Sequence, residues 1–169
     1  VMLPDGGIKD AQFCITRINA CDIPNGFSFF CQHLTPDAVW QPVWQQHPNG
    51  VLELSEFVIV ADDPLHAIQV YARIFAPRRE IVQTGDSFYL QAGKTRLRFI
   101  LPAQAKHEFI ALPDDYSGQP RMSALAFTVS SLAQLRTCLS KGDICFSETD
   151  SGIVVSPANA LNVALRFHE

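Results

Sequence analysis

This chain repeats itself once, and a repeat limits the available folds because two copies of one unit must fold alike. Residues 54–61 read as a strand rich in β-branched residues, and Asp62-Asp63-Pro64 then supplies signals for the start of a helix. Apolar residues follow at helical spacing, from Leu65 to Phe75. Three short strands at residues 80–84, 87–91 and 95–101 come next, separated by glycine-containing turns. The order is strand, helix, strand, strand, strand.

The segment from Met122 onward repeats this order. Residues 123–129 read as a strand, Ser131 offers a helix cap, and Gly142 closes the helix. Strands at residues 144–147, 152–155 and 161–167 complete the second copy, and the repeat period is about 67 residues. The pattern predicts an α+β fold with two βαβββ units, at residues 51–106 and 121–169. A polar linker at residues 107–120 joins them.

The first 50 residues do not make a complete unit. Residues 11–18 and 26–33 read as two strands, so residues 1–34 form a strand pair that resembles the end of such a unit. Residues 35–50 then act as a connector, in which Thr35 and Pro36 are typical of a short helix start. The strand pair is either the tail of an upstream unit or a simple N-terminal hairpin.

Composition excludes several classes of function. The net charge is −4 and no basic run occurs, which argues against nucleic-acid binding. No stretch is long and apolar enough to cross a bilayer, and the first residues do not look like a signal peptide, so we expect no membrane contact and a cytoplasmic location. The five cysteines are scattered and suit reduced, buried thiols better than disulfides or a zinc site.

A resemblance to a known family comes from the middle of the chain. The run Gln32-His33-Leu34-Thr35-Pro36, followed by Trp40, Trp44 and the segment from His47 to Gly50, resembles bacterial glyoxalase-like proteins of the vicinal oxygen chelate superfamily. The resemblance implies curved, mixed β-sheets of tandem βαβββ units with helices packed on the outer face. It also implies that residues 1–34 end an upstream unit. Lyases and dioxygenases share this fold, so it specifies no single chemistry.

The resemblance also implies where a metal would bind, namely on the first and last strands of each unit. Strand alternation predicts that Val58 and Val60 pack on the helix and that Phe57 points into the cavity. Phe57 and Ala124 would then occupy the histidine positions of metal-binding relatives, and Arg98 and Arg166 the glutamate positions. None of these side chains binds a metal. We therefore expect no metal and no cofactor in this chain; a divalent metal would belong to an upstream module.

Arg98 and Arg166 are the main candidates for ligand binding. Two guanidinium groups at equivalent positions could converge on a carboxylate or a phosphate. The alternative is that both arginines are exposed or pair with acidic residues nearby, the candidates being Glu53, Glu56 and Glu148.

Further binding candidates are Phe57, which would fill the cavity, and Gln32 and His33, which end a strand of the upstream module. His33 could equally just connect that strand to the following helix. We interpret His168, next to the C-terminus, as a solvated residue.

Three functions remain open, and the sequence does not decide whether the chain is an enzyme. A metal-dependent glyoxalase or ring-cleaving enzyme lacks its ligands here. A metal-free module could bind a small, anionic metabolite through Arg98 and Arg166. The alternative is a structural or dimerising half of a larger lyase- or dioxygenase-type enzyme, whose active site lies in an N-terminal half outside this sequence. A small-molecule ligand and a homodimer fit these readings.

Overall fold

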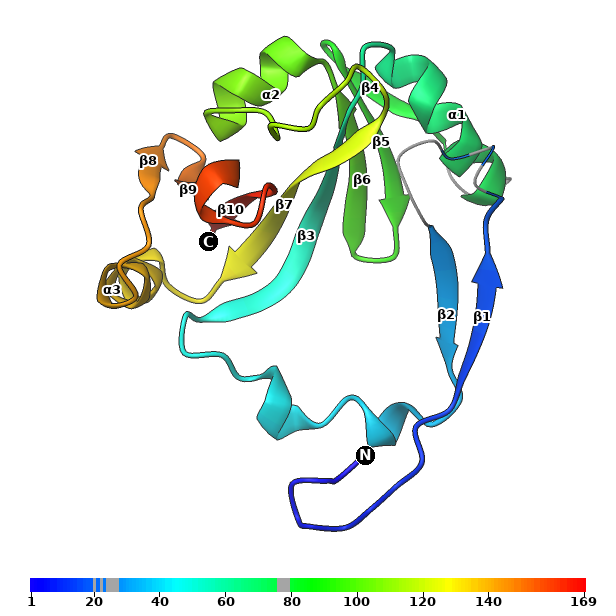
Figure 1. Cartoon of the computed structure of the whole chain (residues 1–169), viewed down its shortest axis with the longest axis vertical. Helices are drawn as coiled ribbons and strands as arrows, with labels where there is room; N and C mark the ends of the chain where they lie inside the picture. The colour runs from blue at the N-terminus through cyan, green and yellow to red at the C-terminus, as the bar shows by residue number, and fades with distance from the viewer. Residues whose placement is uncertain (20, 22, 24–27, 76–79) are drawn as a thin grey trace. The chain divides into compact units, whose positions relative to one another are not determined.

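The chain divides into two compact units, Val1–Pro48 and Asn49–Glu169. The computed structural model describes residues 1–19, 21, 23, 28–75 and 80–169 (Figure 1). No helix among these residues is long and apolar enough to cross a membrane.

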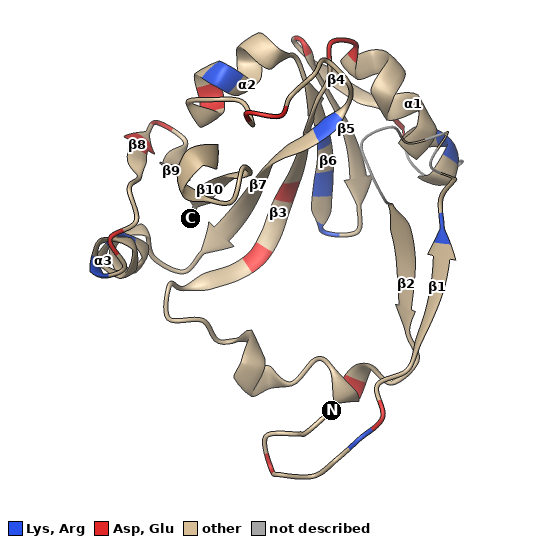
Figure 2. Ribbon diagram, in the orientation of Figure 1, with Lys and Arg blue, Asp and Glu red and all other residues tan. Residues whose placement is uncertain are grey.

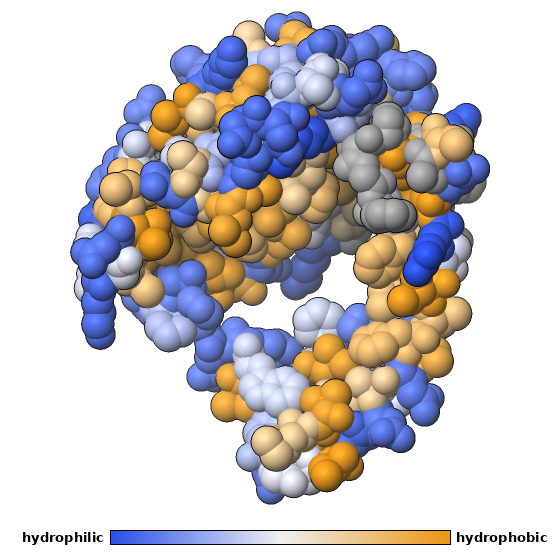
Figure 3. Space-filling model, in the orientation of Figure 1, coloured by the Kyte–Doolittle hydropathy of each residue, from blue (hydrophilic) through white to orange (hydrophobic). Residues whose placement is uncertain are grey.

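The first unit contains one β-hairpin. Strands β1 (Phe13–Arg17) and β2 (Phe29–His33) pair antiparallel, and short 3-10 turns follow at Pro36–Ala38 and Pro42–Gln45. The predicted beginning of the second strand, at residues 26–27, lies outside the described residues. Apolar side chains of this hairpin lie at the surface (Figure 3), among them Phe13, Ile15, Phe29 and Phe30. The predicted short helix begins at Pro36, but the Thr35 side chain does not cap it; its hydroxyl accepts a hydrogen bond from the Gln12 amide and donates one to the Asp10 carbonyl.

The second unit is built on one mixed sheet of eight strands, in the order β4-β5-β6-β3-β7-β10-β9-β8. Its first half consists of β3 (Val51–Val60), β4 (Val82–Thr84), β5 (Ser87–Ala92) and β6 (Thr95–Ile100). Its second half consists of β7 (Arg121–Val129), β8 (Ser147–Thr149), β9 (Gly152–Val155) and β10 (Ala164–His168). In each half the first and last strands pair parallel, and β3 and β7 join the halves antiparallel. This is the predicted tandem βαβββ arrangement.

One face of the sheet is covered by the two helices that the repeat predicts. Helix α1 (Pro64–Phe75) begins where the Asp63 carboxylate accepts a hydrogen bond from the His66 amide. Helix α3 (Leu132–Lys141) begins at the predicted cap, where the Ser131 hydroxyl accepts from the Gln134 amide, and it ends at Gly142. We call the face that α1 and α3 cover the outer face.

The prediction of which β3 residues reach the outer face was wrong by one position. Ile59 and Ala61 pack with Ile68 of α1, and Phe57 packs against the same cluster. Phe57 and Ile59 pair with Leu97 and Phe99 of β6, whose apolar side chains face α1 as predicted. Phe57 therefore does not point into a cavity. Because this part of β3 is apolar on both faces, the sequence shows no alternation of polar and apolar residues. It therefore does not reveal which face of the strand meets the helix.

The opposite face of the sheet carries a third helix, α2 (Pro102–Phe109), in a segment where no helix was predicted. We call this the α2 face. Its apolar core joins two α2 residues to residues of both halves of the sheet: Val58, Val60, Ile100, Ala105, Phe109, Ala124 and Ala164. Helix α2 thus lies on the side that the family resemblance assigns to the cavity.

Two smaller predictions also need correction. The five cysteines are free, but none is buried; Cys14, Cys21, Cys31 and Cys145 are exposed and Cys138 is half-buried. Of the three closing strands predicted for the second copy, the first and the third shift, since β8 begins at Ser147 and β10 begins only at Ala164. A 3-10 turn at Pro157–Asn159 and left-handed backbone at Leu161 and Asn162 occupy the residues before β10.

Candidate functional site

Charged residues gather on the α2 face, where the first and last strands of both halves meet. Figure 2 shows acidic positions on β3 next to basic positions on β6, with an acidic position on α2. The residues in contact are Glu56, Arg96, Arg98, Glu108 and Arg166. We call them the arginine cluster.

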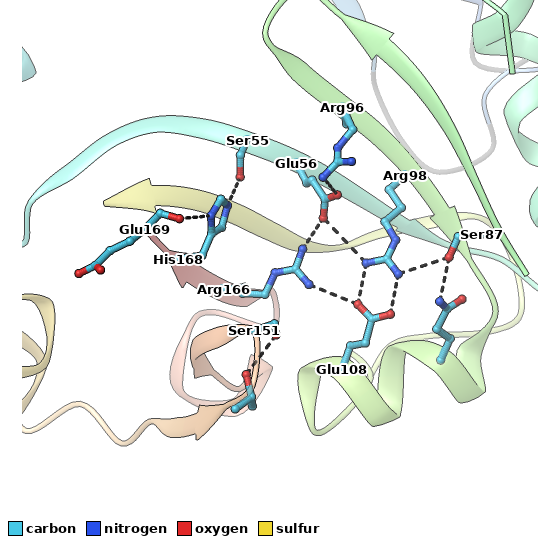
Figure 4. A network of polar contacts seen from close by, with 12 residues as sticks. Ser55, Glu56, Ser87, Arg96, Arg98, Glu108, Ser151, Arg166, His168 and Glu169 are labelled. Carbon is cyan, nitrogen blue, oxygen red and sulfur yellow. Dashed lines mark hydrogen bonds and ion pairs between the residues drawn. The ribbon is translucent and has the colours of Figure 1, made fainter. Parts of the chain in front are cut away.

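A two-pronged pairing in the arginine cluster joins β6 to α2. Both terminal nitrogens of Arg98 donate to Glu108, over 2.6 Å to Oε2 and 2.5 Å to Oε1. This two-pronged geometry matches the planar guanidinium to the planar carboxylate. Arg166 of β10 donates to the same carboxylate over 3.3 Å. One carboxylate therefore bridges two arginines from different halves of the sheet (Figure 4).

Glu56 of β3 is the second acid of the cluster and is 3% exposed. Arg166 donates a hydrogen bond to it, Arg96 lies 2.9 Å from its carboxylate, and Arg98 lies 3.8 Å away. A buried carboxylate needs such partners, since an unpaired charge away from water is strongly destabilising. Three arginines thus meet two glutamates, which leaves one positive charge in excess.

The pairing shifts the ionisation of the central residues. Burial alone would raise the pKa of Glu108, but the hydrogen bond from Arg98 and the charges of Arg98 and Arg166 outweigh it, so the pKa lies below its ordinary value of 4.5. Burial would lower the pKa of Arg98, and its contacts with Glu108 and Glu56 reverse the direction. Both groups are therefore fully charged at neutral pH.

Two polar atoms next to this pair are buried without a hydrogen-bond partner in the described part of the chain. They are Nε of Arg98, a donor, and Oε1 of Gln104, an acceptor. The other groups of both side chains are engaged, since Gln104 Nε2 donates to the Ser87 hydroxyl over 2.8 Å and Arg98 donates to the same oxygen over 3.3 Å. Orphaned buried polar atoms are rare in folded proteins, so each one calls for an explanation.

Ser55 and His168 lie beside the arginine cluster, their side chains 2.8 Å apart between the hydroxyl and Nε2. Ser55 and Glu56 are consecutive, yet both reach partners on the α2 face. A register shift between Leu54 and Glu56 in the β3–β7 pairing explains this, because a bulge re-aims the side chains around it. His168 is half-buried, and its ring is paired with Ser55, so it is only partly solvated.

Equivalent positions in the two halves follow from the parallel strand registers. Glu56 pairs with Arg96 in the first half as Ala124 pairs with Ala164 in the second, and Ala124 lies 68 residues after Glu56. By the same offset Arg98 is equivalent to Arg166. The counterpart of Ala124 is therefore Glu56, not Phe57.

These residues do not fit a divalent metal. The equivalent opening positions carry Glu56 and Ala124, and the equivalent closing positions carry arginines. Each glutamate is already bound to guanidinium groups, which repel a cation and offer only donors. Within residues 1–19, 21, 23, 28–75 and 80–169, no three His, Cys, Asp or Glu side chains gather as a metal site would require.

The residues that the sequence suggested for ligand binding do not all lie together in the structure. Arg98 and Arg166 come together at Glu108 and Glu56, so pairing with Glu56, named as the alternative, occurs. Glu53 pairs instead with Lys94, and Glu148 with Arg136.

Gln32 and His33 belong to the first unit. His33 contacts the rings of Phe13 and Trp40, with centroids 5.0 and 5.3 Å away, while Gln32 is exposed on β2.

Sequence reasoning missed Glu108, the central acid of the cluster. It lies at the boundary where a polar linker was expected. The signals that could have found it are Pro102, which suits the first turn of a helix, and the four-residue spacing of Ala105 and Phe109. Pro102 and Ala105 were instead assigned to the end of the first unit, and Phe109 to the linker.

Comparisons with known proteins agree with this architecture. No protein-family model matches the sequence, and no curated protein matches it. Among solved structures, the chain is similar to methylmalonyl-CoA epimerase from Mycobacterium tuberculosis, with 18% identity and a TM-score of 0.53, over 72% of this chain and 90% of that one.

It is also similar to the 2,3-dioxygenase LapB from Pseudomonas sp. KL28, with 12% identity and a TM-score of 0.51. That match covers 92% of this chain and 62% of the dioxygenase. Both proteins are members of the vicinal oxygen chelate superfamily. At such low identity the likeness establishes the fold, and the strand order within each βαβββ unit agrees with it. The chain therefore has the glyoxalase-like fold of the vicinal oxygen chelate superfamily.

Proposed function

We propose that residues 49–169 form a metal-free, glyoxalase-like module that binds a small anionic molecule at the arginine cluster. The observation that carries the proposal is the meeting of three arginines with only two glutamates on the α2 face. The excess positive charge favours an anion there, and guanidinium groups recognise carboxylates and phosphates through paired hydrogen bonds.

The position of the cluster supports the proposal further. The family resemblance implies that metal-binding relatives hold their metal on the first and last strands of each unit, and Glu56, Arg98 and Arg166 stand on such strands here. A fixed group of guanidinium donors can orient an anion as a Lewis acid would, although it offers no open coordination position. Recognition of a negatively charged group is thus the chemistry that these residues support.

The accessible part of the site lies toward Arg96, whose side chain is 52% exposed while those of Arg98 and Arg166 are 8% and 12% exposed. An anion approaching the α2 face would meet Arg96 first. The paired side chains of Ser55 and His168 lie nearby and offer neutral hydrogen-bonding groups. We include a cytoplasmic location in the proposal, since the expected ligand is a small metabolite.

Calorimetric titration of the purified protein with acetate and with inorganic phosphate tests this function. Arg166→Met keeps an aliphatic side chain but removes the excess charge, so we expect at least a tenfold loss of anion affinity. Arg136→Met is the matched control, because Arg136 forms its ion pair with Glu148 outside the cluster. Equal affinity of wild type and Arg166→Met, or no binding at all, contradicts the proposal.

A second candidate is a structural role, as the supporting half of a larger enzyme. The specific observation in its favour is that Glu56 and Glu108 together tie β3, β6, β10 and α2 to one another. Under this reading, Arg166→Met lowers stability and no anion binds to either protein. The same titration, accompanied by urea unfolding, therefore separates the two candidates.

A further inference from the structure

We infer that Glu108 and Phe109 occupy the site as an internal ligand, and that the external ligand is a carboxylate attached to an apolar body. This inference rests on the proposed anion-binding function. It adds the chemical class of the ligand and identifies the end of α2 as the group that the ligand displaces.

The carboxylate of Glu108 is bound as an external carboxylate would be. It accepts both terminal nitrogens of Arg98 and a third hydrogen bond from Arg166, so it fills the convergence point of two arginines from equivalent positions. Glu108 reaches this point from α2, a segment that lies between the two repeats and belongs to neither. A carboxylate on a separate molecule could make the same three hydrogen bonds.

The neighbouring residue defines the apolar part. Phe109 is 1% exposed and packs in the cluster that contains Val58 and Ala124, and the guanidinium carbon of Arg166 lies 5.3 Å from the centre of its ring. The end of α2 thus presents a carboxylate and an aromatic ring side by side to the α2 face. An arylalkyl carboxylate carries the same two groups in one small molecule.

Two observations indicate that this occupancy is imperfect. Arg98 Nε and Gln104 Oε1 stay buried without partners among the described residues, so the internal ligand does not satisfy the polar groups around it. Helix α2 also ends at Ile110 with a positive φ of 73° and a ψ of −38°, a backbone conformation that a β-branched residue adopts only under strain. A ligand that replaced the end of α2 would release that strain.

Phenylacetate is the probe for this inference, with acetate and phenylacetamide as its comparisons. Removing the internal carboxylate by Glu108→Ala should raise the affinity for phenylacetate at least tenfold over wild type. Acetate lacks the apolar body and should bind more weakly than phenylacetate, and the neutral phenylacetamide should gain nothing. Glu108→Gln keeps the size of the side chain, so it provides the same test if the alanine variant does not fold.

The outcomes separate this inference from the proposed function. If wild type and both Glu108 variants bind phenylacetate equally, anion binding stands and the internal ligand is refuted. If acetate binds as tightly as phenylacetate in the Glu108 variants, the apolar body is refuted. If no protein binds any carboxylate, the proposed function fails, and this inference fails with it.

Discussion

Burial decides what an arginine–glutamate pair contributes, and this chain contains a natural comparison. Arg98 donates two hydrogen bonds to Glu108 on the α2 face. Arg136 donates two hydrogen bonds, of 2.7 and 3.0 Å, to Glu148 at the surface. The geometry is alike, but the Arg98 side chain is 8% exposed and that of Arg136 is 42% exposed. Water therefore screens the Arg136–Glu148 pair much more than the Arg98–Glu108 pair.

We therefore expect Arg98→Lys to destabilise the protein by about 2 kcal/mol, the scale for losing a hydrogen bond to a charged group. A lysine keeps the charge but cannot reproduce the two-pronged contact with Glu108. Arg136→Lys, the matched control, should leave the midpoint of urea unfolding almost unchanged. Equal midpoints for the two variants would show that the Arg98–Glu108 pair contributes no more to stability than the surface pair does.

Glu108 should also make stability depend on acid. Because its pKa is lowered in the folded state, its ionised form stabilises the protein fully above pH 4.5, and this stabilisation disappears as the pH falls through the folded pKa. Glu108→Gln has no such proton to bind. The difference in unfolding free energy between wild type and Glu108→Gln should therefore be constant from neutral pH to about pH 5 and shrink below 4.5. Urea unfolding across this range measures it; a difference that persists unchanged in acid would contradict the pairing.

Among the secondary-structure elements, the β9–β10 contact depends on one glycine. Gly152 begins β9 with φ of +121°, and a Cβ atom there would lie 2.0 Å from the Phe167 carbonyl oxygen of β10. A side chain at this position would strain the backbone and collide with the neighbouring strand. The strand that carries Arg166 is thus held in place partly by the absence of a side chain opposite to it.

Gly152→Ala should destabilise the protein by more than about 3 kcal/mol, because backbone strain and a collision with main chain add together. The control is Gly93→Ala, since Gly93 also has a positive φ but no atoms within 4 Å of its missing Cβ. The control should cost only about 1 kcal/mol. Thermal unfolding of both variants measures the difference, and similar melting temperatures would rule out the close approach.

The elements that were predicted correctly are those with unambiguous local signals. Ser131 and Gly142 bound α3 as expected, because capping and chain termination are determined within a few residues. Local signals did not decide the face of Phe57, because β3 is buried on both sides and its apolar run has no alternation. At α2 the local signal is ambiguous, because the proline that begins the helix directly follows a strand.

For the molecule as a whole, the repeat predicted the strand order but not the site. Tandem βαβββ units imply that Arg98 and Arg166 are equivalent, and the strand registers confirm it. Their shared partner Glu108 lies outside the repeat, so no symmetry argument could have found it. Contacts between segments far apart in the sequence, such as Glu56 with Arg166, depend on the bulge in β3 and on how the two halves join.

The absence of a metal requirement is a prediction at this scale. Purified protein should contain far less than one equivalent of iron, manganese, nickel or zinc by elemental analysis, because the closing strands carry Arg98 and Arg166 and the opening strands carry Ala124 and an arginine-paired Glu56. Adding these metals should not raise the melting temperature, since a bound ligand stabilises the folded state in proportion to its binding. Stoichiometric metal that survives dialysis and raises the melting temperature would overturn the account.

The central claim is that Arg98 and Arg166 bind one anion together. The most direct test is an NMR titration with phenylacetate that monitors the Nε–H signals of the arginine side chains. We predict that the Arg98 and Arg166 signals shift together with one dissociation constant, while the signal of Arg136, which pairs with Glu148, stays unchanged. Shifts that are absent, or that occur at Arg98 and Arg166 with different constants, would contradict it.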